Sequence, residues 1–287
     1  MTKVVFSWPK GKEGALTTSW DDGTIHDRRL VALFNKHGIK STWNLNSGIF
    51  DSSRKDRFKE NFNKAIYGSA AKNSNKSFLT ATEIARLFKG HEVAVHTEDH
   101  PHLWRCPDEM IFSEVVKDRL TLEKLTGYPV RGMAFPCADT NDKRVNNVLK
   151  RAGILYSRSD KNSGNFELPA DFLCWTGTCH QSTDFVELWT KFLADKNPEK
   201  LFYLWGHSFE FAKENNWARM EDFGKLTGKN PKIWYATNME IYNYASAWRS
   251  LSCSVDMSSV ENKSAETVWF KTDNKLKKLK PGEIVKI

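Results

Sequence analysis

The sequence predicts an α/β protein, a distorted parallel (β/α)7-8 barrel with a small β-rich appendage at its C-terminus. Strand-like and helix-like segments alternate about seven times, which favours parallel strands joined by crossover helices. The length of 287 residues suits a barrel, because such barrels commonly use about 250 residues as one domain. From residue 251 onward the pattern changes to short β-like runs in a polar background. We therefore expect a barrel over residues 1–250 and an extension over residues 251–287.

The alternation can be followed along the chain. A strand over residues 15–20 precedes a helix over residues 26–38, whose apolar side chains share one face and which ends at Gly38. Residues 51–80 are polar and irregular, which predicts a long loop or insertion. Further strands are predicted over residues 40–48, 91–96, 129–136, 154–159, 171–175 and 200–207. Further helices are predicted over residues 80–90, 108–127, 141–153, 183–195 and 216–228, and residues 232–251 supply a last strand and helix.

The composition excludes several classes of protein. The net charge of +8 is spread along the chain, and no nucleic-acid-binding motif is present, so we expect no nucleic-acid partner. The one dense basic run, over residues 271–283, predicts a solvated tail or a hairpin. Five cysteines without a C-x-x-C pair favour reduced thiols. The first residues lack the apolar core of a signal peptide and no run reaches membrane-spanning length, which predicts no membrane contact and a cytoplasmic location, or secretion if a signal was removed.

Two adjacent carboxylates, Asp21 and Asp22, follow the first predicted strand. Like charges at this distance destabilise each other unless a cation lies beside them. One interpretation is a solvated turn, because Asp and Gly commonly form turns and Gly23 comes next. The other is a metal site with a catalytic base beside it.

Histidines occupy other predicted strand ends. His96 and His100 lie four residues apart in "HTEDH", a spacing at which two imidazoles can face one ion. Two imidazoles and one carboxylate form a typical catalytic metal site, although a surface turn with two unrelated histidines is the alternative. His207 follows a further strand, and Arg131 lies within another. Because functional groups of α/β barrels gather where strands end, this joint placement favours an active site.

Four motifs occur in order over residues 14–210: "TSWDDG", "HTEDH", "R-GMAF-P" and "LWGH". The chain resembles the polysaccharide deacetylases, carbohydrate esterase family 4, also called the NodB-homology domain. The resemblance implies a metal-dependent hydrolase that removes acetyl groups from an N-acetylated glycan, with metal-bound water attacking the acetyl carbonyl. It therefore implies an acetylated carbohydrate as the partner, and it gives no indication of oligomeric state.

The resemblance also implies roles for individual residues. Asp22, His96 and His100 would bind a divalent metal, most often zinc, with cobalt, nickel or manganese as alternatives. Asp21 would be the general base, and Arg131 would pair with it and orient it.

His207 would protonate the leaving amine as the general acid. The backbone N–H of Cys137, after Pro136, would help the metal to hold the oxyanion. The chain departs from the family at two places, since Cys137 replaces an aromatic residue and "LWGH" contains one additional residue.

The carboxylate that orients His207 is assigned to Asp171, with Asp184 as a rival. Trp175, which accompanies Asp171, is assigned to substrate binding together with Pro136 and Cys137. Trp205 is expected either to stack on a sugar ring or to pack in the core. His26, His102 and His180 follow predicted strand ends and are further candidates for contacting substrate.

Three alternatives for function remain. The same residues could serve an O-acetyl esterase on a decorated glycan, or a hydrolase of small amides or cyclic imides, because amide and ester hydrolysis need the same metal and base. A non-catalytic glycan-binding module on a barrel is the third, although it would be expected to lack Asp21, a metal ligand or His207. The C-terminal extension either binds substrate or covers the barrel.

Overall fold

The structure is a computed structural model that describes residues 4–50, 78–137 and 142–287. The loop predicted over residues 51–80 lies almost entirely outside the described residues. No helix in the described ranges is long and apolar enough to cross a membrane.

A parallel sheet forms the centre of the molecule and closes on itself. Its strands lie in the order β7-β6-β5-β4-β3-β2-β9-β8. Strand β10 pairs with the first residues of β2, whose last residues pair with β3. Only Thr178 separates β7 from β8, and its N–H donates to Tyr203 O of β9 over 2.8 Å. The two ends of the sheet therefore meet, which confirms the predicted distorted barrel. The strands are β2 (Gly14–Asp21), β3 (Thr42–Leu45), β4 (Glu92–Val95), β5 (Gly132–Ala134), β6 (Tyr156–Asn162), β7 (Trp175–Gly177), β8 (Cys179–His180), β9 (Leu201–Gly206) and β10 (Ile233–Tyr235).

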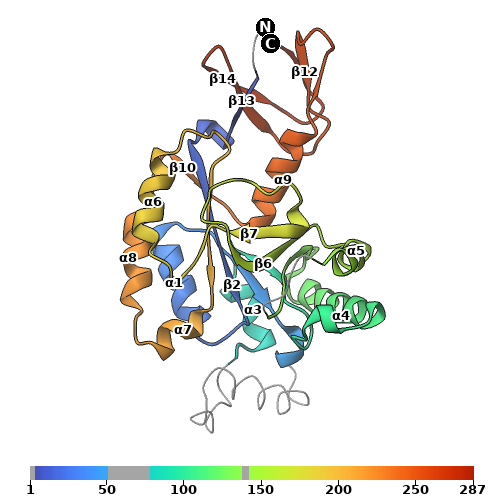
Figure 1. The fold of residues 1–287 in the computed structure, drawn as a ribbon, viewed down its shortest axis with the longest axis vertical. Helices are drawn as coiled ribbons and strands as arrows, with labels where there is room; N and C mark the ends of the chain where they lie inside the picture. Colours follow the sequence, from blue (N-terminus) through green and yellow to red (C-terminus); the bar gives the residue numbers. More distant parts are fainter. Residues whose placement is uncertain (1–3, 51–77, 138–141) are drawn as a thin grey trace.

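Helices surround this sheet (Figure 1). Their apolar faces pack on the strands in one large core, which is why the amphipathic pattern of the sequence predicted most of them. Among the elements that differ from expectation, residues 208–213 form an unpredicted helix, and the strand predicted over residues 171–175 is mostly the 3-10 turn Phe172–Cys174. The helices are α1 (Asp27–His37), α3 (Ile84–Leu87), α4 (Asp108–Thr126), α5 (Lys143–Arg151), α6 (Phe185–Ala194), α7 (Ser208–Lys213), α8 (Ala218–Thr227) and α9 (Asn238–Arg249).

Helix α9 closes the end of the barrel at which the strands begin. Its first residue, Asn238, donates its backbone N–H to Thr42 Oγ1 at the start of β3, and its side chain contacts Thr17 Oγ1 over 2.8 Å. The backbone N–H of Met239 donates to Glu92 at the start of β4. The helix N-terminus thus satisfies buried polar groups of three strands, and this end of the barrel is filled.

The β-rich extension lies beyond α9, at the end of the molecule opposite α3 and α7 (Figure 1). It contains two three-stranded sheets, of which one is completed by the N-terminal strand β1. The basic run over residues 271–283 forms a hairpin. The strands are β1 (Val5–Ser7), β11 (Ser252–Cys253), β12 (Ser259–Glu261), β13 (Val268–Thr272), β14 (Lys275–Leu279) and β15 (Ile284–Lys286).

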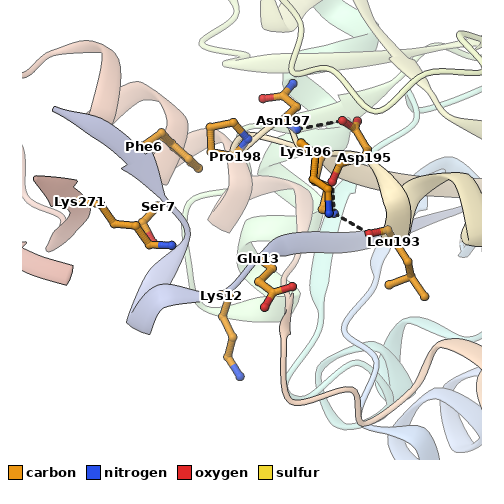
Figure 2. A pocket seen from close by; sticks show the side chains of 11 residues that line it. Phe6, Ser7, Lys12, Glu13, Leu193, Asp195, Lys196, Asn197, Pro198 and Lys271 are labelled. Atoms are coloured by element: carbon orange, nitrogen blue, oxygen red, sulfur yellow. Dashed lines mark hydrogen bonds between the residues drawn. The ribbon is translucent and has the colours of Figure 1, made fainter. Parts of the chain in front are cut away.

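A pocket lies where the extension meets the barrel. Figure 2 shows Phe6, Ser7 and Lys271 on one side of it and Asp195, Lys196 and Asn197 on the other. The pocket is next to Glu13, which precedes β2, so it lies at the end where the strands begin. It is therefore separate from the strand ends that carry the candidate catalytic residues.

Candidate metal centre and catalytic groups

Asp21 and Asp22 form the tight turn after β2. Asp21 is the last residue of the strand, and Asp22 adopts a left-handed backbone with φ of 81°. This conformation is uncommon for a residue with a Cβ atom and tends to be retained at functional sites. The backbone N–H of Asp22 donates to Asn44 O at the end of β3, which holds the turn in place. Both carboxylates are buried.

Asp22, His96 and His100 converge on one point. Asp22 Oδ1 lies 3.4 Å from His96 Nε2 and 3.6 Å from His100 Nε2. The three ligand atoms lie within 4.8 Å of one another, so one ion can contact them all. Asp22 Oδ1 is buried and has no hydrogen-bond partner among the described residues. A buried carboxylate oxygen left in this state is costly without a cation, so these residues fit the metal that the resemblance implies.

The protonation of the ligands suits a cation. His96 Nδ1 lies 2.9 Å from Ala134 O and can donate to that carbonyl, which in the neutral ring leaves the Nε2 lone pair facing Asp22. Although burial opposes its charge, the neighbouring Asp21 and Asp22 raise the pKa of His96, so a cation at Nε2 would displace a proton. Burial, together with the neighbouring His96, lowers the pKa of His100 to about 4, so its imidazole is neutral at pH 7. Although burial opposes its ionisation, the three surrounding imidazoles lower the pKa of Asp22 to about 2.

The loop that carries the two histidines is held in an unusual backbone conformation. Thr97 has φ of 69° and His100 has φ of 55°. The side-chain amide of Asn46 donates to the carbonyl oxygens of His96 and Thr97, over 2.5 Å and 2.9 Å. The conformation is therefore imposed by its surroundings, which is the condition under which such backbone persists.

Helix α4 supplies further contacts to this loop. Asp118 accepts hydrogen bonds from the backbone N–H groups of His96 and Ser47, over 3.0 Å and 2.8 Å. One turn earlier, Glu114 accepts from the backbone N–H of Asp99 over 2.9 Å. Both acids are buried. The loop that carries His96 and His100 is thus positioned by side chains that the sequence analysis did not identify.

Asp21 is paired with Arg158 of β6 in a buried ion pair, and Asn44 Nδ2 donates to it over 2.8 Å. Burial opposes ionisation of Asp21, but the Arg158 charge and the neighbouring His96 and His207 lower its pKa below the usual value. Asp21 is therefore an ionised carboxylate at neutral pH, as a general base must be.

The prediction that Arg131 pairs with Asp21 is wrong. Arg131 is exposed and lies before β5, in a pocket with Tyr128 and His91 at the opposite end of the barrel. The register of the sheet explains the difference, because Arg158 pairs with Ala134, three residues further along the strand than Arg131. A residue level with Ala134 lies at the carboxyl ends of the strands, near Asp21, whereas Arg131 lies before its strand begins.

His207 faces both acids of the first turn. Its Nε2 lies 3.8 Å from Asp21 Oδ2 and 4.0 Å from Asp22 Oδ2. Its Nδ1 lies 3.1 Å from Glu210 Oε1, in the first turn of α7. Although burial opposes its charge, the bond to Glu210 and the two aspartates raise the pKa of His207 to about 9. His207 therefore carries a proton at neutral pH, which a general acid requires.

The prediction that Asp171 orients His207 is also wrong, and its rival Asp184 does not do so either. Both side chains are exposed and cap helical turns: Asp171 accepts from Leu173 N over 2.9 Å, and Asp184 accepts from Val186 N over 3.0 Å. The orienting carboxylate is Glu210, because α7 begins at Ser208 and one helical turn brings residue 210 back to the imidazole.

Helix α7 is also fixed to the first turn. Ser208 Oγ donates to Asp27 of α1 and lies 2.9 Å from Thr24 Oγ1. Burial and the charges of the two neighbouring aspartates raise the pKa of Asp27 well above its usual value, although Ser208 opposes this. Asp27 is therefore a buried acid whose protonated form is favoured, and it joins the elements that carry Asp21 and His207.

The structure places His180 in the same group. It ends β8, and its Nε2 lies 3.4 Å from Glu210 Oε2, so Glu210 lies between two imidazoles. The other candidate histidines differ, since His102 is exposed beside Trp104 and His26 precedes α1.

The predicted aromatic substrate contacts are core residues. Trp175 is 1% exposed and packs edge-on against Tyr156, Phe172 and Tyr203, which contradicts its assignment to substrate. Trp205 is buried, and the Arg158 guanidinium covers its ring at 4.4 Å. Its position agrees with the packing alternative.

Pro136 and Cys137 follow β5 at the correct end of the barrel. Pro136 is buried, and Cys137 is partly exposed with φ of 62°. Cys137 Sγ lies 3.6 Å from His100 Nδ1, so the residue lies beside a metal ligand. Its N–H as an oxyanion donor stays a prediction.

The comparisons with known proteins can now be set beside this geometry. The chain is similar to the solved structure of a putative polysaccharide deacetylase from Mycobacterium smegmatis (TM-score 0.58, 17% identity, 87% of this chain and 96% of that one). It is also similar to Puue allantoinase (TM-score 0.55, 12% identity, 82% of this chain and 91% of that one). Another similar structure is that of the Streptococcus pyogenes deacetylase PplD in complex with acetate (TM-score 0.43, 19% identity, 55% of this chain and 61% of that one). The chain thus spans less than two thirds of PplD.

These structures are under 25% identical and show the fold alone. No curated protein matches the chain. The family model described as "Polysaccharide deacetylase" matches residues 9–157, just over half of the chain, and covers the elements that carry Asp21, Asp22, His96 and His100. The chain belongs to the polysaccharide deacetylase family.

Proposed function

We propose that this chain is a metal-dependent hydrolase that removes the acetyl group from an N-acetylated glycan of the chitooligosaccharide or peptidoglycan type and releases acetate. The observation that carries the proposal is the pairing of Asp21 with His207 beside the Asp22–His96–His100 cluster. Their environments shift the two pKa values in opposite directions, which is how an acid and a base of one reaction are recognised.

A divalent cation, with zinc as the first expectation, would be held by Asp22, His96 and His100 and would supply Lewis-acid chemistry that polarises a carbonyl group and makes water more acidic. Asp21 accepts the proton of the attacking water. The Arg158 ion pair and the Asn44 amide keep that carboxylate ionised and fix its direction, so that no reorganisation is needed during the reaction.

His207 donates a proton from Nε2 to the departing amine nitrogen. Glu210 accepts the Nδ1 proton, which fixes the orientation of the ring and favours its charged form. The remaining requirement is a donor to the oxyanion, and we assign it to the backbone N–H of Cys137, whose position beside His100 supports this.

The test is acetate release from N-acetylglucosamine oligomers, peptidoglycan fragments, acetylated xylan and a generic acetyl ester. Each is assayed with added zinc, with a chelator, and on Asp21→Asn. Asp222→Asn, on the exposed face of α8, is the matched control. We expect release from the amide substrates that the chelator and Asp21→Asn abolish and Asp222→Asn leaves unchanged.

Other outcomes identify the alternatives. Release from esters alone would replace the proposal with an O-acetyl esterase. No release from any substrate, with bound zinc demonstrated by metal analysis, would favour a small amide or cyclic imide. Release that a chelator does not affect would contradict the role given to the metal.

A further inference from the structure

A second group of ligand-type side chains lies beside the first. His180, His207 and Glu210 each present one nitrogen or oxygen, and these three atoms lie within 4.8 Å of one another. They come from the end of β8, the residue after β9 and the first turn of α7. Two imidazole nitrogens and one carboxylate oxygen form a ligand set that suits zinc.

We propose that His180, His207 and Glu210 form a second cation site, weaker than the first, that takes zinc or a similar divalent metal. Glu210 lies between the rings, with Oε1 3.1 Å from His207 Nδ1 and Oε2 3.4 Å from His180 Nε2. Binding of the ion does not depend on the proposed deacetylation.

The surroundings of the cluster suit a ligating role. His180 Nδ1 lies 2.8 Å from Ser182 Oγ and accepts the backbone N–H of Ser182 over 3.3 Å, so the ring is held in place by the residues around it. The side-chain amide of Gln181 donates to Glu210, as groups around a ligating carboxylate commonly do. The three ligand side chains are 18–24% exposed, so an ion can enter from solvent.

A comparison of hydrogen bonds explains why the second site is weaker. Asp22 Oδ1 has no hydrogen bond to lose among the described residues when a cation binds. In the second cluster an ion must replace the contact between His207 Nδ1 and Glu210. The Nδ1 proton then leaves to solvent as the nitrogen–metal bond forms. That exchange lowers the net gain from binding.

An ion at the second site should also change the rate of turnover, and this expectation rests on the proposed function. The ion separates His207 from the carboxylate that orients it and holds the ring as a ligand. With a metal in place of the Nδ1 proton, His207 is no longer an imidazolium, so its Nε2 proton is less acidic and passes less readily to a departing amine. Excess zinc should therefore slow acetate release, while zinc at one equivalent supports it.

The test measures zinc bound to the metal-free chain by equilibrium dialysis and atomic absorption. We expect two zinc ions per wild-type chain, with dissociation constants that differ at least about tenfold. His180→Gln should keep only the tighter ion, and His96→Gln should lose the tighter one. His102→Gln, an exposed histidine outside both groups, is the matched control and should bind two.

A single ion on the wild type, or two ions on a folded His180→Gln chain, would overturn the second site. Retention of the tighter ion by His180→Gln shows that the variant has folded. Acetate release with one equivalent of zinc tests the proposed function separately, so the two can fail independently. Inhibition by excess zinc that is equal in the wild type and in His180→Gln would refute the effect on His207.

Discussion

Buried carboxylates occur at both ends of the barrel, and their surroundings differ. At the end where the strands begin, Glu92 accepts hydrogen bonds from Thr42 Oγ1, Tyr156 OH and Met239 N. At the end where they finish, Asp22 Oδ1 has no such partner among the described residues. Because burying a polar group without a partner is costly, the difference favours a stabilising role for the first end and supports the proposed cation at the second.

Aromatic packing follows the same division. Phe6, Trp8 and Tyr244 lie with ring centroids 4.8–5.8 Å apart at the end where the strands begin, joining β1 to α9. Contacts of this kind contribute about 0.5–1.5 kcal/mol each beyond their buried area. At the other end, the buried groups are charged and contribute little net stability. Substitutions at the two ends should therefore differ in what they change.

The largest effect should come from Arg158. We expect Arg158→Met to lower the rate of acetate release by about a hundredfold or more, because Asp21 loses the cation that keeps it ionised and oriented. Arg131→Met, the matched control, should leave the rate unchanged, since Arg131 lies at the other end of the barrel. Circular dichroism checks that both variants fold. A slow Arg131→Met enzyme would contradict the assignment of these two arginines.

An intermediate effect is expected at Glu210. The proton on His207 is needed for catalysis, so activity should fall as the pH rises through its pKa of about 9. Glu210→Gln removes a charge that raises this pKa, and the alkaline limb of the pH–rate profile should move to lower pH by about one unit or more. Glu214→Gln, one turn later on an exposed position, is the control. An unchanged alkaline limb in Glu210→Gln would exclude Glu210 as the orienting group.

The smallest effect on activity should come from the other end. Tyr244 OH donates to Ser7 O over 2.6 Å and accepts from Trp269 N over 2.9 Å. Tyr244→Phe should lower the free energy of unfolding by about 1–2 kcal/mol, because both partners are left unpaired, and should leave kcat unchanged. Urea denaturation and steady-state kinetics measure the two quantities. A reduced kcat without reduced stability would break the proposed separation of the two ends.

Position along the chain was enough to predict which of the first set of candidate residues lie together. Asp21, Asp22, His96, His100 and His207 each end or follow a strand, and parallel strands bring such residues to one edge. The alternation of apolar patterns likewise predicted the barrel, because crossover connections leave few other arrangements.

Residues whose role depends on register or on an unpredicted element could not be found this way. Choosing Arg158 over Arg131 requires knowing that Arg158 lies level with Ala134, which spacing along one strand does not reveal. Glu210 requires knowing that a helix begins at Ser208. The sequence held one signal for each residue. Arg158 lies inside a predicted apolar strand, and Glu210 follows His207 by three residues.

The pairing of β1 with β13 has a consequence for the order in which the protein assembles. Val5–Ser7 is synthesised long before its partner Val268–Thr272. Contacts between such distant segments form slowly, because a long stretch of chain must be brought together before they are gained. The strands up to β9 can pair before β13 has been made, whereas β1 must wait for it. During that interval Phe6 and Trp8 lack their final cover, and the nascent chain is then most open to aggregation.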